Sequence, residues 1–311
     1  MNANHEVLIL SGAISSEREV SLRSGQNAYR LLADLLPVRL CELADSELPP
    51  GLDPRRTVIF PLVHGEFGED GHLQALLDRD GFVYVGSGKD SMELTINKAR
   101  TKERVTAGDI PTLPHFTFSV AEKEKLSFEK ACGSVGAAEL FLKPNDRGSS
   151  IHCYPCVDEE SWIRALADVE EGQWIVEPLC RGRDVTVALL HGKALSALEV
   201  SHGGNFLDYQ AKYSVGAAEH LCPAPIGGVL TARLRNYAER AFSLCDCRDW
   251  ARVDFLLRPD GAIFFLEVNG IPGFTETSFF PDCAAGAGIS PAECLQKLIG
   301  PTLERHRYRY P

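Results

Sequence analysis

Apolar and polar residues alternate with a period of two along two neighbouring runs late in the chain. The runs span residues 251–257 and 262–269, and Pro259-Asp260-Gly261 separates them. This pattern predicts a β-hairpin in which alternate side chains share a face. We pair Leu257 with Ala262 across the turn, which puts Glu267 opposite Arg252. The polar face then holds Arg252, Asp254, Glu267 and Asn269, and the apolar face holds Val253, Phe255, Phe264, Leu266 and Val268.

The polar face of this predicted hairpin carries candidate metal ligands. Two carboxylates and an amide oxygen are hard ligands, and Mg²⁺ is usually bound by one or two carboxylates together with substrate phosphates. The guanidinium of Arg252 is suited to hold oxygens of a transferring phosphoryl or acyl group. The run Gly270-Ile271-Pro272-Gly273 leaves backbone N–H groups uncovered for an oxyanion. The alternative is an exposed face of salt-bridged charges.

Short apolar runs alternate with helix-like segments in the first part of the chain. Residues 7–10, 38–41 and 57–62 are predicted strands, and the capping-box pair Ser16 and Glu19 predicts a helix start. This order is typical of an α/β domain, in which ligands bind at the carboxyl ends of the strands. His64 follows such a strand, and Glu17 falls in the first helical turn. Each either contacts a ligand or is structural, and the sequence leaves both interpretations open.

The middle of the chain carries candidate nucleotide contacts. Residues 140–151 combine an apolar strand, Lys143 and a Gly148-Ser149-Ser150 turn, a pattern that suits phosphates but is also found in surface hairpins. Glu177 and Asp184 flank a short linker, where they contact adenine and ribose or are simply exposed. Residues 203–221 are a predicted lid. We find neither a P-loop nor a dinucleotide-binding glycine motif.

Composition limits the class of protein. The chain has 311 residues, a formal net charge of −11 and ten cysteines. The length predicts two or three domains, which we assign to residues 1–94, 95–180 and 181–311. The acidic charge argues against nucleic-acid or anionic-membrane binding and favours a small-molecule substrate. The start of the chain lacks a basic signal-peptide region, so we expect a cytoplasmic protein with buried thiols. A zinc site from Cys153-x-x-Cys156 and Cys245-x-Cys247 is the alternative.

Ten short motifs follow one another in the order and spacing of one family. With them the chain resembles the D-alanine:D-alanine ligase family of the ATP-grasp superfamily over essentially its whole length. The resemblance implies an α/β protein with an ATP-grasp fold preceded by a Rossmann-like, parallel-sheet N-terminal domain. The motifs are residues 16–22, His64-Gly65 with Gly68-Glu69-Asp70-Gly71, Lys98, Lys143-Pro144 with Gly148-Ser149-Ser150, Glu177, Ala211-Lys212-Tyr213, Cys222-Pro223-Ala224, Arg252-x-Asp254, Glu267-x-Asn269 and Pro272-Gly273.

The resemblance implies an ATP-dependent ligase that joins two D-alanine molecules for peptidoglycan precursors. ATP phosphorylates the carboxylate of the first D-alanine, the amine of the second attacks this D-alanyl phosphate, and phosphate leaves. The alternatives are ligation of D-alanine to D-serine or D-lactate, and a catalytically silent nucleotide-binding protein. The family expectation for assembly is a homodimer.

The resemblance also implies a role for each candidate site residue. Two Mg²⁺ ions, or Mn²⁺ in their place, are held by Asp254, Glu267 and Asn269. The oxyanion is stabilised by Arg252 and the Gly273 N–H. ATP is bound by Lys98 and Lys143 at its phosphates, Glu177 at adenine and Asp184 at ribose. The first D-alanine is bound by Glu17 and His64, the carboxylate of the second by Lys212 and Ser278, and Ser149 links Glu17 to the lid residue Tyr213.

One departure from the family pattern bears on nucleotide binding. The phosphate loop usually carries a glycine where this chain has His152. A Cβ and an imidazole at this position are expected to hinder closure of the loop over ATP. The expected effect is on nucleotide affinity rather than on the chemistry.

Overall fold

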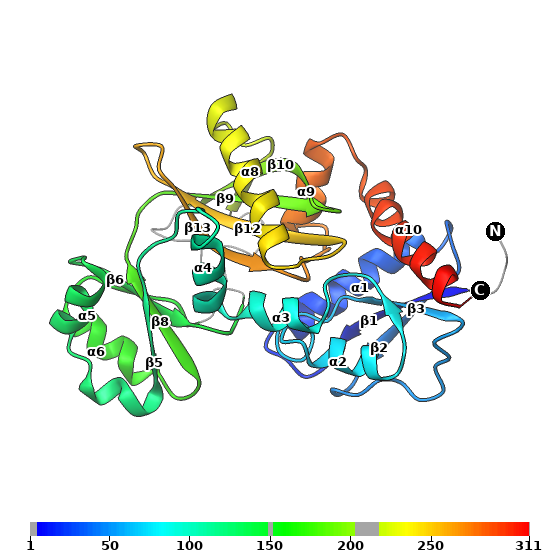
Figure 1. The fold of residues 1–311 in the computed structure, drawn as a ribbon, viewed down its shortest axis with the longest axis horizontal. Helices are drawn as coiled ribbons and strands as arrows, with labels where there is room; N and C mark the ends of the chain where they lie inside the picture. Colours follow the sequence, from blue (N-terminus) through cyan, green and yellow to red (C-terminus); the bar gives the residue numbers. More distant parts are fainter. Residues whose placement is uncertain (1–4, 149–151, 203–217, 311) are drawn as a thin grey trace.

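Three β-sheets organise the protein (Figure 1). The computed structural model describes residues 5–148, 152–202 and 218–310, and the statements below concern these residues. In Figure 1 the N-terminal sheet lies at the right, the central sheet at the left and the C-terminal sheet above and between them. Each sheet falls within one of the segments 1–94, 95–180 and 181–311, whose boundaries stay a prediction.

The N-terminal sheet is parallel, as predicted for a Rossmann-like domain. Helices cover it, and one of them comes from the other end of the chain: Leu295 and Leu298 of the last helix share a buried core with Val7 and Ile9. Because helices cover both faces, its two inner strands, Glu6–Gly12 and Thr57–Pro61, are largely apolar and buried. In the order β2-β1-β3-β4 the strands are Val38–Leu43, Glu6–Gly12, Thr57–Pro61 and Val83–Tyr84, and the helices are α1 (Arg18–Leu32), α2 (His72–Arg79) and α10 (Pro291–Arg309).

The start of α1 differs from the prediction. Glu17 is the N-cap residue, and Ser16 forms no capping box with Glu19. The reason is local, because the neighbouring Ser15 hydroxyl shapes the turn: its Oγ accepts the Glu17 N–H at 3.2 Å and donates to the His64 carbonyl at 2.8 Å. These bonds bring Glu17 close to the end of β3.

The central sheet is antiparallel and has its own small core, which includes Trp162, Trp174 and Leu142. Two helices cover one of its faces (Figure 1). In the order β5-β8-β6-β7 the strands are Phe116–Ser119, Gln173–Pro178, Leu140–Pro144 and Tyr154–Cys156, and the helices are α5 (Phe128–Val135), α6 (Glu159–Ala167) and the short η1 (Val120–Lys125).

The C-terminal sheet carries the predicted hairpin at one edge. Helix α4 (Lys98–Thr106), which follows α3 (Lys89–Ile96), lies between this sheet and the central one (Figure 1). The described helices are all too short or too polar to cross a membrane. In the order β11-β10-β9-β12-β13 the strands are Ala218–Leu221, Lys193–His202, Arg183–Leu190, Trp250–Leu257 and Ile263–Asn269, and the helices are α8 (Gly228–Leu244) and α9 (Phe279–Gly286).

The hairpin forms, but its register differs from the prediction in two places. The turn is one residue longer, so Leu257 pairs with Ile263. A β-bulge at Leu266 then adds a second residue to β13. The two offsets sum to a shift of two residues. Because side chains alternate with a period of two, the predicted polar residues stay together on one face. Asp254 therefore pairs with Glu267, and Arg252 with Asn269.

The bulge also corrects the predicted apolar face. Phe265 is fully buried and packs edge to face on Phe255, with ring centroids 6.2 Å apart. Phe264 and Leu266, which we expected in the core, are only partly buried, and Leu266 lines a cavity instead. The extra residue thus turns Leu266 toward the polar face.

Candidate functional site

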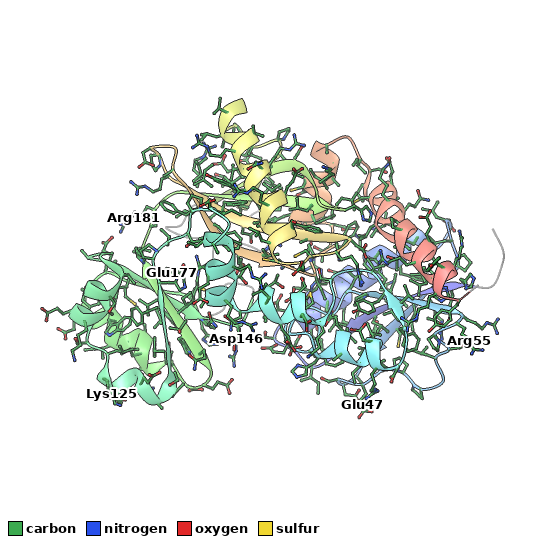
Figure 2. The ribbon with its side chains drawn as sticks, in the orientation of Figure 1. Glu47, Arg55, Lys125, Asp146, Glu177 and Arg181 are labelled. Atoms are coloured by element: carbon green, nitrogen blue, oxygen red, sulfur yellow. The ribbon has the colours of Figure 1, made fainter. Side chains whose placement is uncertain are left out.

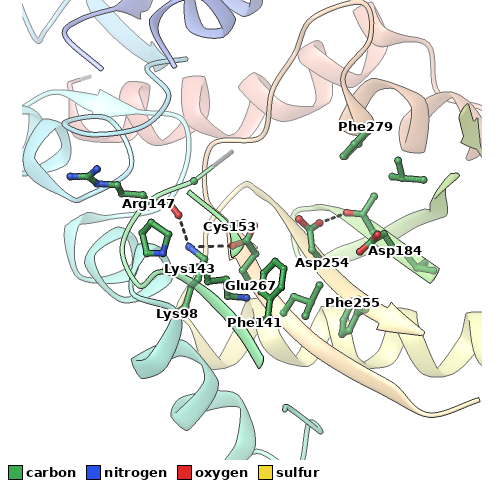
Figure 3. Close-up of a pocket in the computed structure, with 16 residues that line it drawn as sticks. Lys98, Phe141, Lys143, Arg147, Cys153, Asp184, Asp254, Phe255, Glu267 and Phe279 are labelled. Carbon is green, nitrogen blue, oxygen red and sulfur yellow. Dashed lines mark hydrogen bonds and ion pairs between the residues drawn. The ribbon is translucent and has the colours of Figure 1, made fainter. Parts of the chain in front are cut away.

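A cavity of about 800 Å³, counting its open mouth, lies between the central and C-terminal sheets (Figure 3). Its walls combine lysines, carboxylates and apolar side chains, a composition suited to a charged ligand with a flat apolar part. Its lining residues include Lys98, Lys143, Asp184, Thr186, Asp254 and Glu267.

A second cavity, of about 560 Å³, lies against the N-terminal domain. It shares three lining residues with the first, Gly148, Glu267 and Phe279, so the two cavities meet beside the hairpin. A group carried by a ligand in one cavity can therefore reach a ligand in the other. The second cavity is also lined by Glu17, His64, Arg252, Asn269, Gly273 and Ser278.

The hairpin face supplies a fixed guanidinium and two carboxylates at this meeting point. Arg252 donates Nε to Asp254 Oδ1 at 2.9 Å and an Nη to Oδ2 at 2.8 Å. The Thr186 hydroxyl, on the adjacent strand β9, donates to the same Asp254 Oδ1 at 2.5 Å. The guanidinium also stacks over Phe279, 5.3 Å from the ring centroid. These contacts fix Arg252 and Asp254, so their charges need not reorganise when a ligand binds.

Lys98 reaches the same point from the start of α4 (Figure 3). Its ammonium lies 3.4 Å from Glu267 Oε2 and donates to the Arg147 carbonyl at 2.5 Å. Asn97 caps the helix by accepting the Arg100 N–H at 3.0 Å. The cap sets where α4 begins and so directs Lys98 into the cavity.

Glu177, labelled in Figure 2, is buried between two lysines and does not itself line the first cavity. Its Oε1 lies 2.6 Å from Lys102 Nζ and its Oε2 lies 2.6 Å from Lys143 Nζ. Burial acts to raise the pKa of Glu177, but the two ammonium groups outweigh it and lower that pKa to about 2. For Lys143 the carboxylate outweighs burial and raises the pKa. Glu177 and Lys143 are therefore charged at neutral pH.

His64 is buried and neutral in the second cavity. Burial lowers its pKa to about 4, and the neighbouring charge of Arg252 acts in the same direction. Its Nε2 lies 3.1 Å from Ser24 Oγ, which also accepts the Phe274 N–H. These bonds hold the ring at the end of β3.

Two carboxylates lie close together at the second cavity: Glu17 lines it, and Glu69 lies behind Glu17. A Cβ added to Gly148 would lie 2.7 Å from Glu17 Oε1 and 3.8 Å from Glu69 Oε2. Burial, together with the negative charge of Glu17, raises the pKa of Glu69 well above its usual value. Glu69 accepts the Gly65 N–H at 2.9 Å. A positively charged group of a ligand is favoured beside such a pair.

Gly273 and Ser278 form the end of this cavity. Ser278 Oγ accepts the Thr275 N–H at 2.9 Å, which folds the loop back on itself. A Cβ on Gly273 would lie 2.8 Å from Ser278 Oγ, so the close approach requires glycine.

The structure brings most of the predicted site residues to the two cavities. Lys98, Lys143, Asp184, Asp254 and Glu267 line the first, and Glu17, His64, Arg252, Asn269, Gly273 and Ser278 line the second. Glu177 lines neither and reaches the first only through Lys143. Ser149, Lys212, Tyr213 and residues 203–217 of the predicted lid 203–221 lie outside the described residues. The last four residues of that segment, Ala218–Leu221, form the edge strand β11 rather than a loop.

The alternative of a zinc site finds no support in the described part of the chain. No group of three or more His, Cys, Asp or Glu side chains there is arranged to hold a metal ion by itself. Burial raises the pKa of the Cys156 thiol to about 12. The expectation of buried thiols fits Cys156.

Three residues at or beside the site were not predicted as site residues from the sequence. Lys102 lies four residues after Lys98 on α4, a spacing that places both on one face of a helix. Thr186 lies two residues after Asp184 on β9 and shares its side of the sheet. Glu69 was visible only as part of a glycine-rich motif.

Together these features define the class of protein. A central antiparallel sheet and a C-terminal sheet enclose a cavity lined by lysines and carboxylates, and a parallel sheet precedes them. This is the architecture of an ATP-grasp enzyme, as predicted, and solved structures of that class share it.

Comparison with known proteins identifies the family. A family model described as D-ala D-ala ligase C-terminus matches residues 105–300. A D-alanine–D-alanine ligase of Nitratidesulfovibrio vulgaris is 37% identical, with 94% of this chain and 97% of that protein covered. One from Oleidesulfovibrio alaskensis is 36% identical, covering 96% and 97%. The chain belongs to the D-alanine–D-alanine ligase family.

Solved structures agree with this assignment. The D-alanine–D-alanine ligase of Bacillus anthracis superposes with a TM-score of 0.84 at 26% identity, covering 98% of this chain and 99% of that one. The VanG D-Ala:D-Ser ligase of Enterococcus faecalis gives 0.83 at 25% identity, covering 96% and 99%. The fold therefore serves ligases that differ in the second substrate.

Proposed function

We propose that this protein joins two D-alanine molecules at the expense of ATP, through a D-alanyl phosphate, to supply peptidoglycan precursors. The observation that carries the proposal is the meeting of the two cavities at Gly148, Glu267 and Phe279. A nucleotide in the first cavity then presents its terminal phosphate to a carboxylate in the second. Alignment of this kind accounts for much of the catalysis of phosphoryl transfer.

The first cavity would bind ATP. Lys98 and Lys143 face the phosphates, and Asp184 accepts hydrogen bonds from the ribose hydroxyls. A contact between Glu177 and the adenine amino group remains part of the proposal, although its carboxylate already binds two lysines. The solved ATP complex of the Bacillus anthracis ligase, with a TM-score of 0.83, supports nucleotide binding in this fold.

The hairpin fits a divalent cation that arrives with the nucleotide. Asp254 and Glu267 pair across the two strands and offer carboxylate oxygens, and Asn269 offers an amide oxygen. Two carboxylates with substrate phosphates are a usual Mg²⁺ environment, so a complete protein cage is not needed. Two Mg²⁺ ions, or Mn²⁺, would neutralise charge on the transferring phosphoryl group. In the structure, the Asp254 carboxylate accepts hydrogen bonds from Arg252 and Thr186.

The second cavity would bind the amino acids. Glu17 receives the ammonium of the first D-alanine, and the neutral His64 lies near its carboxylate. Arg252 and the Gly273 N–H hold the oxyanion that forms when the second amine attacks. Ser278, with Lys212, holds the second carboxylate, and Ser149 and Tyr213 connect Glu17 to the lid. A closed lid protects the acyl phosphate from water.

Ligation to D-serine is the second candidate, because the VanG D-Ala:D-Ser ligase shares the fold. The Lys212-Tyr213 pair favours D-alanine, since it resembles the D-alanine-selecting form. We further propose that the enzyme acts in the cytoplasm as a homodimer, as the family expectation states.

Phosphate release tests the proposed function. The protein is incubated with ATP and Mg²⁺ and with D-alanine, D-serine, D-lactate or L-alanine. D-alanine alone is expected to support turnover, and its product is D-alanyl-D-alanine. Turnover that requires D-serine or D-lactate would favour the second candidate. Nucleotide binding with no release in any mixture would show a silent nucleotide-binding protein.

A further inference from the structure

Lys102 is a buried lysine that none of the proposed roles uses. Its side chain has no exposed surface, and it lines neither cavity. Its ammonium pairs with Glu177 Oε1 at 2.6 Å and donates to the Phe265 carbonyl of β13 at 3.2 Å. Lys102 therefore joins α4 to β8 of the central sheet and to β13 of the C-terminal sheet.

Lys102, Glu177 and Lys143 form a row of three ion-paired groups that ends at the first cavity, the one proposed for the nucleotide (called the nucleotide cavity below). Lys102 binds one oxygen of Glu177, and Lys143 binds the other. Only Lys143 lines the cavity. A carboxylate held by a single lysine would form a closed neutral pair, but a carboxylate shared by two lysines leaves a net charge of about +1.

From this geometry we infer that Lys102 is a positioning residue of the nucleotide site: it neutralises Glu177, so that the charge of Lys143 stays available to the nucleotide phosphates. The inference rests on the proposed binding of ATP in the first cavity. Lys102 acts through Glu177 and touches no ligand. Its contact with the Phe265 carbonyl also fixes it relative to the hairpin strand β13.

A charge series measured by ADP binding tests the inference. Lys102→Met removes one positive charge and leaves a neutral pair, so ADP is expected to bind about tenfold more weakly. The double variant Lys102→Met with Glu177→Gln restores the net charge of about +1. The ratio of ADP affinity to adenosine affinity, which cancels any loss of the proposed adenine contact of Glu177, is therefore expected to recover to within about threefold of the wild-type ratio. Adenosine, which lacks phosphates, is expected to bind the wild type and Lys102→Met equally well.

The control is Lys123→Met in the central domain. Like Lys102, Lys123 donates to backbone carbonyls, in its case those of Val169 at 2.8 Å and Leu166 at 3.2 Å. It lines neither cavity. Its ADP affinity should equal that of the wild type. Lys102→Gln keeps an N–H donor and lacks the charge, so it replaces Lys102→Met if that variant does not fold.

Two outcomes would overturn the inference. ADP affinity that is unchanged in Lys102→Met would remove any role in phosphate binding. A weakened ratio of ADP to adenosine affinity that the double variant does not restore would show a packing role. In turnover, the KM for ATP should rise and the KM for D-alanine should not. Because ADP binding needs no turnover, its result is separate from failure of the wild type to release phosphate with D-alanine, which would contradict the proposed function.

Discussion

The two cavities differ in how they arrange their charges. In the nucleotide cavity each lysine has a carboxylate beside it: Lys143 has Glu177 at 2.6 Å, and Lys98 has Glu267 at 3.4 Å. In the second cavity, proposed for the amino acids, the lining residue Glu17 lies near the buried carboxyl group of Glu69, and burial keeps His64 neutral.

This difference explains what each cavity can bind. Opposite charges in contact stabilise one another's ionised forms: the pKa of Glu177 is lowered to about 2 and that of Lys143 is raised, so this pair stays charged around neutral pH. Neighbouring carboxylates favour an added positive charge, so the amino-acid cavity suits an ammonium group. In the proposed function, the first cavity is organised before the nucleotide arrives, whereas the second gains a balancing charge from the amino acid.

Removal of the hairpin carboxylates is expected to have the largest effect, because both cavities depend on them. Asp254→Ala and Glu267→Ala should each lower turnover by roughly 1,000-fold or more. Each removes a proposed ligand of the metal ion that would neutralise charge on the transferring phosphoryl group. Phosphate release with ATP, Mg²⁺ and D-alanine measures the loss. The control is Asp260→Ala in the exposed turn of the same hairpin, which should retain activity. Full activity in both site variants would refute the assignment of the hairpin.

Gly148→Ala, at the junction of the two cavities, should lower activity less than removal of the hairpin carboxylates does. The added Cβ would lie 2.7 Å from Glu17 Oε1, so the carboxylate must move from the position proposed for the ammonium. Strain of about 1–3 kcal/mol is expected, and kcat/KM for D-alanine should fall by roughly 10- to 100-fold. Gly133→Ala in α5 is the control, because a Cβ there has no neighbour within 4 Å. Equal kinetics in the two variants would contradict the placement of Glu17.

His64 should make the amino-acid cavity sensitive to acid. An unfolded histidine titrates near pH 6.5 and the folded His64 near pH 4. As the pH falls through this window the unfolded chain binds a proton that the folded chain does not, so stability present above pH 6.5 is lost toward pH 4. The loss should reach roughly 3 kcal/mol at pH 4. Urea unfolding from pH 7 to pH 4 measures it.

The matched variant is His64→Gln, which cannot bind that proton. Its stability relative to the wild type should improve as the pH falls, by the same amount. His72→Gln, whose side chain is largely exposed, shows the effect of losing an imidazole at the surface. A constant difference between His64→Gln and the wild type would mean that His64 does not titrate as proposed.

The smallest effect is expected at His152, beside the nucleotide cavity. Its backbone φ is +56°, in the left-handed region that favours glycine, and its Nδ1 lies 3.1 Å from the Tyr154 hydroxyl. His152→Gly relieves about 1–2 kcal/mol of strain, but the freer unfolded chain offsets most of it. ADP should bind up to about threefold more tightly, as measured by calorimetry. Weaker binding would show that the imidazole assists the nucleotide.

The sequence predicted the elements of the site better than their register. A period of two was enough to place Arg252, Asp254, Glu267 and Asn269 on one face. It did not reveal the longer turn or the bulge at Leu266, because both depend on how β13 packs against the rest of the sheet. The prediction of the polar face held only because the two offsets sum to two residues.

Lys102 shows the limit of local reasoning. Its spacing from Lys98 was visible, but its partners are Glu177 on β8 and the Phe265 carbonyl on β13. These groups are far away in the chain and meet only when both sheets have formed. A buried charge is therefore recognised from tertiary structure and not from its neighbours in sequence.

An oxygen-18 transfer experiment tests the central claim most directly, that the two cavities bring ATP and the D-alanine carboxylate together. D-alanine labelled with oxygen-18 in its carboxylate is incubated with the enzyme, ATP and Mg²⁺, and the released phosphate is analysed by mass spectrometry. Transfer through D-alanyl phosphate predicts one labelled oxygen in each phosphate. Unlabelled phosphate, released while D-alanyl-D-alanine forms, would contradict the account.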